Sequence, residues 1–132
     1  MRKFKMLLIA ALATLAFVGC TAVPVQNINN TAVAINSTNK ATIQGVERAI
    51  IQAGGSLGWV MKKVNSGKIQ GVLTLRKHVA VVLITYNANE YSITYQDSTA
   101  LDYNPADNTI HKNYNGWIQN LNKAIQVQLS ML

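Results

Sequence analysis

The sequence predicts an α+β fold, in which an antiparallel sheet of about four strands carries an N-terminal and a C-terminal helix packed on one face. Apolar residues recur at three- and four-residue steps over 43–57 and again over 114–132, as they do on one face of a helix. Residues 59–95 contain short apolar or alternating runs separated by turn residues, a pattern typical of antiparallel strands. Two apolar helical stripes beside one sheet favour helices that cover one side of it.

The first predicted helix begins near residue 43 and ends near Gly54-Gly55. Glycine weakens a helix, because it loses more conformational freedom on folding than any other residue. Glu47 and Arg48 fall outside the apolar stripe. The stripe consists of Ile43, Val46, Ile50, Ala53 and Leu57.

Four strands are predicted between the helices. Residues 59–64 and 69–76 form a hairpin around Asn65-Ser66-Gly67-Lys68, which has the composition of a tight turn. Residues 79–86 are apolar on both faces, which indicates a central strand. Residues 91–95 alternate in polarity and form the fourth strand.

The second predicted helix begins between residues 112 and 115 and has roughly five turns. Its apolar stripe consists of Tyr114, Trp117, Ile118, Leu121, Ile125, Leu129 and Leu132.

Length and charge limit the classes of function. The 132 residues suit one small domain, which we place at residues 42–132. Removal of residues 1–19 leaves nine basic and five acidic residues, a net charge of +4 that is too small for a nucleic-acid-binding tail. Because the chain has one cysteine, an intramolecular disulfide and a zinc site built on paired cysteines are both excluded.

The first 20 residues have the pattern of a secretory signal. A basic start is followed by an apolar run, residues 6–18, that is short for a membrane span, and then by Gly19-Cys20. Phe17-Val18-Gly19-Cys20 resembles the lipobox of bacterial lipoproteins. This resemblance implies a signal peptide over residues 1–19, cleavage before Cys20, and diacylglycerol on the Cys20 sulfur. The alternatives are an ordinary signal peptide and an uncleaved anchor.

The residue after the cysteine bears on location. In lipoproteins of enteric-type bacteria an aspartate at that position favours inner-membrane retention, and here the residue is Thr21. The resemblance therefore implies an outer-membrane anchor that faces the periplasm in a Gram-negative host. Residues 21–41 are rich in Asn, Thr, Ala and Val with no acidic residue, which predicts a flexible tether. Together with the lipid that the resemblance implies on Cys20, residues 20–41 would form a lipidated cysteine and its tether. A short strand over residues 31–35 is the alternative.

Two histidines, His78 and His111, are the candidates for chemistry at neutral pH. A metal site would need both of them and a carboxylate such as Asp97 or Asp102, and no spacing requires it. No G-x-S-x-G segment supports a serine hydrolase. We therefore predict that these histidines bind nearby groups to hold loops, with no catalytic residue, metal or cofactor. A small hydrolase or metal-dependent enzyme that uses both is the alternative.

Two surfaces are candidates for binding. The cations within residues 62–77 make up five of the nine basic residues that follow the leader, and they suit anionic lipid or an envelope polymer or, alternatively, a solvated sheet edge. If helices cover one face, the strand over 79–86 exposes an apolar row on the other, which predicts a protein interface, a homo-oligomer or, alternatively, a ligand groove. The cations are Lys62, Lys63, Lys68, Arg76 and Lys77, and the row is Val79, Val81 and Leu83.

A second resemblance covers roughly residues 45–130. The run Arg76-Lys77-His78, the tyrosines at 86, 91 and 95, and the segment Ile110-His111-Lys112-Asn113-Tyr114-Asn115-Gly116-Trp117 are similar to small bacterial envelope lipoproteins. This resemblance implies no activity. It makes one further set of side chains candidates for interaction, namely His78, His111, Asn113, Tyr114, Asn115 and Trp117.

The sequence thus predicts a lipid-anchored, non-enzymatic periplasmic module that binds an envelope component or a protein partner. A purely structural envelope lipoprotein remains an alternative.

Overall fold

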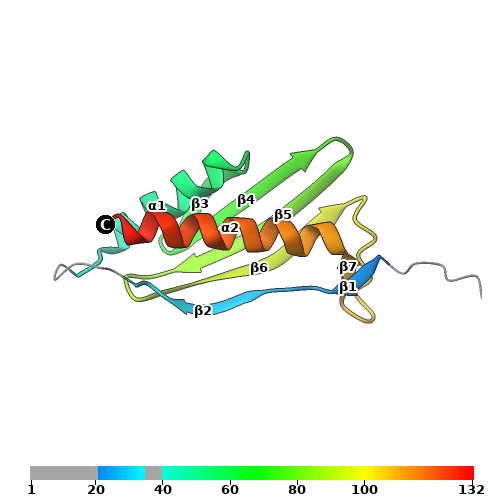
Figure 1. Ribbon diagram of the computed structural model, residues 1–132, viewed down its shortest axis with the longest axis horizontal. Helices are drawn as coiled ribbons and strands as arrows, with labels where there is room; N and C mark the ends of the chain where they lie inside the picture. Colours follow the sequence, from blue (N-terminus) through cyan, green and yellow to red (C-terminus); the bar gives the residue numbers. More distant parts are fainter. Residues whose placement is uncertain (1–20, 35–39) are drawn as a thin grey trace, which may run out of the picture.

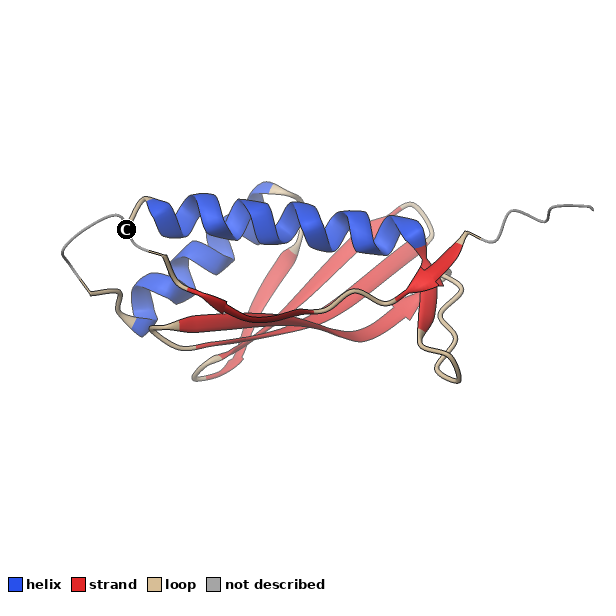
Figure 2. Ribbon diagram, turned by 60° about the horizontal axis from the view of Figure 1, so that its bottom comes forward, coloured by secondary structure: helices blue, strands red, loops and turns tan. Residues whose placement is uncertain are grey.

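The computed structural model describes residues 21–34 and 40–132, which form a sheet layer and a helix layer (Figures 1 and 2). The elements in chain order are β1 Ala22–Pro24, β2 Ile28–Ala32, α1 Ile43–Ser56, β3 Val60–Asn65, β4 Lys68–Leu75, β5 His78–Tyr86, β6 Glu90–Thr99, β7 Thr109–His111 and α2 Lys112–Ser130. The main sheet is antiparallel, in the order β2-β6-β5-β4-β3, and β1 pairs with β7 at one end. Figure 2 shows both helices on one side of the sheet, so the predicted α+β fold is confirmed.

Helix α1 has an N-terminal cap at Thr42 and packs closely on the edge of the sheet. The Thr42 hydroxyl accepts a hydrogen bond from the N–H of Gly45 at 3.0 Å, which satisfies one of the free amides of the first turn. A Cβ on Gly54 would lie 2.5 Å from the Met61 sulfur of β3. Glycine in the last turn therefore does more than weaken the helix, because it allows α1 to approach this strand.

Strand β5 lies at the centre of the sheet, as predicted. Its side chains alternate between the two faces, and those on the helix side are buried. The β3–β4 hairpin is also confirmed, with Gly67 at φ +78° in its turn and the Gly67 carbonyl accepting from the Tyr86 amide of β5. Helix α2 begins at the predicted position and buries one stripe, which consists of Tyr114, Ile118, Leu121, Ile125 and Leu129.

The N-terminal segment differs from the prediction. Residues 21–34 were expected to be a tether, but β1 pairs with β7 and β2 pairs with β6 at the edge of the main sheet. The expected boundary at residue 42 is therefore wrong over this stretch, whose strand β2 overlaps the alternative strand at 31–35. Residues 1–20, with Cys20, and residues 35–39 lie outside the described residues.

Side-chain hydrogen bonds explain why such a polar segment is ordered. The Asn27 side chain accepts from the Tyr95 amide at 3.0 Å, and the Asn30 amide donates to the Ser92 hydroxyl at 2.9 Å. Three half-buried apolar residues of the segment pack against the core, namely Val25, Ile28 and Val33. The asparagines that indicated a spacer thus attach the irregular edge strand β2 to β6. An edge strand needs fewer apolar residues than a central one, because one of its sides faces solvent.

Candidate interaction face

The face of the sheet opposite the helices carries the predicted apolar row. Val79, Val81 and Leu83 of β5 are half-buried, and no helix or strand within residues 21–34 and 40–132 covers them. The strand register extends the row sideways, since Val81 pairs with Val72 of β4 and Val72 pairs with Val60 of β3. Val60 is 70% exposed. An apolar band therefore crosses three strands on this face.

A pair of glutamines bridges the band. Gln70 of β4 donates from Nε2 to Oε1 of Gln96 on β6 at 3.2 Å, and β5 lies between these two strands. Gln96 is the extra residue where the β6 register shifts opposite Val81 and Val82, and such a bulge can redirect a side chain. Because Gln70 is paired with Leu83, the bridge passes over β5 and contributes to its partial burial.

The predicted cations do not form one patch. Lys62 is paired with Gln70 on the open face, beside the apolar band. Lys68 begins β4, whereas Arg76 and Lys77 follow its last residue, so the two groups are separated by about 23 Å of extended strand. The cations therefore lie near both ends of the hairpin, and Lys62 and Lys68 are on the open face, because Lys68 and Gln70 point to the same side of β4.

Lys63 is on the other side of β3 and has a structural role. Its Nζ lies 3.1 Å from Oε2 of Glu47 in α1, and the Tyr86 hydroxyl donates to the same oxygen at 2.6 Å. The hydrogen bond from Tyr86, followed by that from Lys63, lowers the pKa of Glu47. Burial, followed by the bond to Glu47, raises the pKa of Tyr86 to about 12. These three side chains join α1 to the sheet, so Lys63 is removed from the candidate surface.

The two histidines have the predicted loop-holding role. His78 Nδ1 lies 2.8 Å from the Ala100 carbonyl oxygen, to which it donates, and its ring centroid is 6.5 Å from that of Trp117. His111 Nδ1 accepts from the Asn113 amide at 3.1 Å and caps α2. Among residues 21–34 and 40–132 no three His, Cys, Asp or Glu side chains are placed to hold a metal.

The side chains around His111 serve the fold more than the surface. Asn115 accepts from the Gln26 amide and donates to the Pro24 carbonyl, both at 2.9 Å, so it holds the N-terminal segment on α2. Tyr114 is fully buried, and it cannot contact a partner. The prediction that Tyr114 belongs to an interaction surface is therefore wrong, whereas Asn115 is half-buried and stays a candidate. Asn113 is exposed, and Trp117 is half-buried.

Tyr114 has a buried hydroxyl with no hydrogen-bond partner among the described residues. Because removal of an unsatisfied buried hydroxyl costs no bond, Tyr114→Phe is expected to keep the free energy of unfolding or raise it by up to about 1 kcal/mol. The Tyr91 hydroxyl donates to Asn122, so Tyr91→Phe is the matched control and should lose about 1 kcal/mol. Urea denaturation of both variants measures the difference. Equal losses would mean that the Tyr114 hydroxyl binds a buried water.

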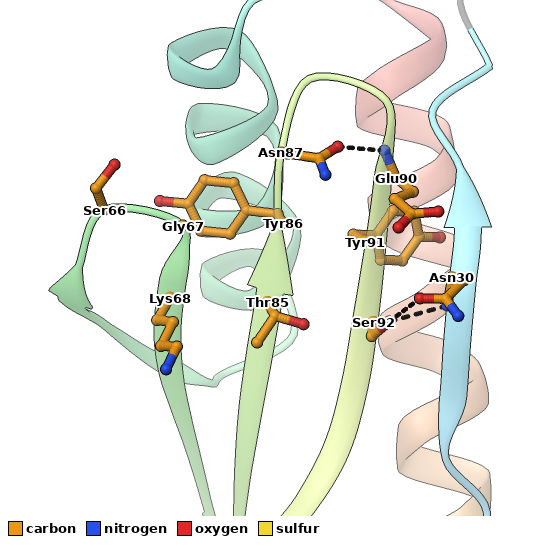
Figure 3. Close-up of a pocket in the computed structure, with 10 residues that line it drawn as sticks. All are labelled: Asn30, Ser66, Gly67, Lys68, Thr85, Tyr86, Asn87, Glu90, Tyr91 and Ser92. Atoms are coloured by element: carbon orange, nitrogen blue, oxygen red, sulfur yellow. Dashed lines mark hydrogen bonds between the residues drawn. The ribbon is translucent and has the colours of Figure 1, made fainter.

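A polar hollow of about 260 Å³, shown in Figure 3, lies at the end of the sheet where the β3–β4 and β5–β6 turns meet. Exposed Lys68 and Glu90 are its charged lining residues, and the Ser92 hydroxyl accepts from the Asn30 amide at its border. The sequence indicated the turns but not their meeting, since that depends on strand register. The two charged groups that line it are solvent-exposed, so they offer a ligand no desolvated charge.

A second hollow of about 330 Å³ lies between the end of α1 and the outer side of α2. Leu57 and Val127, which are 41% and 53% exposed, line it. The helical periodicity placed Leu57 in the core, and the structure corrects this, because α1 ends at Ser56.

None of the helices in the described part of the chain is long and apolar enough to cross a membrane. Comparisons of the chain with models of known protein families, with curated proteins and with solved structures found no match.

Proposed function

We propose that the chain is a lipoprotein anchored in the cell envelope through Cys20, and that its folded domain acts by binding a protein partner. The anchor is supported by Gly19-Cys20, which follows a basic start and an apolar run over residues 6–18. A cysteine thiolate is a nucleophile suited to lipid transfer. In a Gram-negative host, Thr21 after the cysteine favours the outer membrane, with the domain in the periplasm.

The open face of the sheet supports binding of a protein rather than an anionic polymer. Val72, Val81 and Leu83 provide an apolar centre, and polar side chains such as Lys62 and Gln70 border it. Protein interfaces have this arrangement of an apolar core within a polar rim. A polymer of negative charge would instead need a continuous run of cations, and here Lys62 and Lys68 near one end of β4 are separated by most of that strand from Arg76 and Lys77 after its other end.

Mass spectrometry of the membrane fraction tests the anchor. The expected product begins at Cys20, with a diacylglyceryl thioether on its sulfur, and Cys20→Ser should accumulate as the uncleaved precursor. A mature chain with an unmodified Cys20, or an intact leader in the unaltered protein, would overturn the anchor.

Photocrosslinking in cells tests the binding face. A photoreactive residue at Val81 should yield a defined adduct, whereas the same residue at Gln52, which is exposed on α1, should not. Val72→Lys is expected to abolish the Val81 adduct, because it places a charge in the apolar band beside it. The adduct mass distinguishes a second copy of this chain from another protein. No adduct from Val81, or the same adducts from Gln52, would support a purely structural role.

A further inference from the structure

The chain is held to the domain from the first residue after Cys20. The Lys112 amide donates to the Thr21 carbonyl at 3.0 Å, and the Val25 amide donates to the Asn108 carbonyl at 2.9 Å. Between them, β1 pairs with β7, and Asn115 bonds both Pro24 and the residue after Val25. Residues 21–26 are therefore part of the fold and provide no slack.

The lack of slack brings the attachment point to the domain surface. The Cα atoms of Cys20 and Thr21 are about 3.8 Å apart by covalent geometry. A flexible spacer of about 20 residues would instead allow a reach of roughly 25 Å. A lipid on Cys20 would thus hold the β1–β7 end of the domain at the bilayer surface.

The turn between β4 and β5 lies at the same end of the molecule in both views (Figures 1 and 2). A chain of hydrogen bonds connects it to β7, since His78 bonds the Ala100 carbonyl and the His111 amide donates to the Leu101 carbonyl. The turn residues are Arg76, at φ +56°, and Lys77, and both are exposed. Exposed Lys112 begins α2 at this end.

We propose, on the basis of the lipidation of Cys20 proposed above, that the domain lies directly on the bilayer through its β1–β7 end and that Arg76, Lys77 and Lys112 contact anionic phospholipid headgroups. Basic side chains close to a membrane surface are attracted by its negative potential within about one Debye length. The loop before β7 holds two exposed acids, Asp102 and Asp107, so the net charge of this end is only slightly positive. The covalent lipid therefore provides the affinity, and the three cations set the orientation.

This orientation determines what the rest of the protein can reach. Strands β2 and β6 run close to the long axis of the molecule and β4 and β5 run obliquely to it, so the sheet extends away from the membrane end (Figure 1). The polar hollow with Lys68 and Glu90 is at the opposite end of the sheet and faces away from the lipid. The open face with the apolar band around Val81 is then roughly perpendicular to the bilayer plane. A partner bound to it must lie beside the domain, near the membrane.

Fluorescence quenching in vesicles tests the orientation. The full lipidated protein carries an added cysteine, either Thr74→Cys near the membrane end or Ser66→Cys in the opposite turn, and a fluorophore on it. The labelling is specific because the Cys20 thiol is consumed by lipid. In vesicles that contain phosphatidylglycerol and a lipid with a nitroxide headgroup, we expect quenching at residue 74 to be several-fold stronger than at residue 66. Equal quenching at the two sites would overturn the proposal.

Two controls separate the effect of the short connection to Cys20 from the effect of the basic side chains. Insertion of a Gly/Ser segment of about 20 residues directly after Cys20 should remove the difference between the labels, because it restores a flexible reach. The double variant Arg76→Glu, Lys77→Glu should weaken quenching at residue 74 in vesicles with phosphatidylglycerol, with no change in pure phosphatidylcholine. Equal weakening in both lipids would overturn the role of the cations.

Failure of the anchor is a separate result. Vesicle flotation and mass spectrometry of the same preparation report whether Cys20 carries lipid before any quenching is measured. A lipidated, floating protein with no difference between residues 74 and 66 contradicts the orientation alone. A protein without lipid that does not float contradicts the proposed anchor.

Discussion

A chain that begins at residue 35 is expected to be less stable than one that begins at residue 20 by about 5 kcal/mol. Three half-buried apolar side chains of the removed segment, Val25, Ile28 and Val33, pack on the core and are worth about 1 kcal/mol each. The lost hydrogen bonds to β6, β7 and α2 contribute about 1 kcal/mol each where they are well shielded from water. A small domain has a total stability of about 5–15 kcal/mol, so the truncated chain should be partly or fully unfolded.

Urea denaturation followed by circular dichroism measures this difference, with Cys20→Ala in the longer chain to keep it free of lipid. Asn115→Ala is the milder test of the same contacts, because it removes two hydrogen bonds and leaves the segment in place. We expect it to lower the free energy of unfolding by about 1–3 kcal/mol and to speed hydrogen exchange at the Gln26 amide. The same denaturation midpoint for the long and the truncated chain would mean that residues 21–34 are a tether after all.

Alkaline pH is expected to destabilise the domain strongly. Burial, followed by the hydrogen bond to Glu47, raises the pKa of Tyr86 from 10.0 to about 12. A folded-state pKa above the unfolded one contributes stability that is complete below pH 10 and is lost as the pH rises from 10 toward 12. A shift of two units corresponds to about 3 kcal/mol for this tyrosine. Burial also raises the pKa values of Tyr91, Tyr95 and Tyr114, so the total loss is larger.

Denaturation at pH 9 and at pH 11.5, together with the ultraviolet absorbance of tyrosinate, tests this expectation. The tyrosinate signal should rise together with the loss of circular dichroism, because the buried phenols ionise when the domain unfolds. Tyr86→Phe is the control, and it should reduce the difference in unfolding free energy between the two pH values. A full tyrosinate signal near pH 10 with an intact fold would contradict the burial of these side chains.

Local patterns in the sequence were sufficient to predict most strands of the main sheet and both helices. The first helix, expected from about residue 43 to near Gly54-Gly55, spans Ile43–Ser56, and the second helix begins at Lys112, within the expected range. Strand alternation put Val79, Val81 and Leu83 in one row, and the structure shows that this row lies on the face away from the helices. These features follow from the sequence because each helix or strand shows its buried face as a repeat among neighbouring residues.

Long-range contacts explain what local patterns missed. Strands β1 and β7 have three residues each, too few for a periodic signal, and each is ordered by the other. The tether was a wrong prediction because polar residues of β2 bond the edge of β6 about 60 positions later in the chain, as the Asn30–Ser92 pair does.

The sequence by itself determined the α+β class, the two amphipathic helices and the apolar row on β5, and it contains the lipobox-like segment at Cys20. Each of these features depends only on residues that are close together in the sequence. Only the tertiary structure decided that the segment after Cys20 belongs to the fold. Asn115 bonds the Gln26 amide across 89 positions of sequence, and such a contact forms only when the sheet and α2 have brought the two residues together.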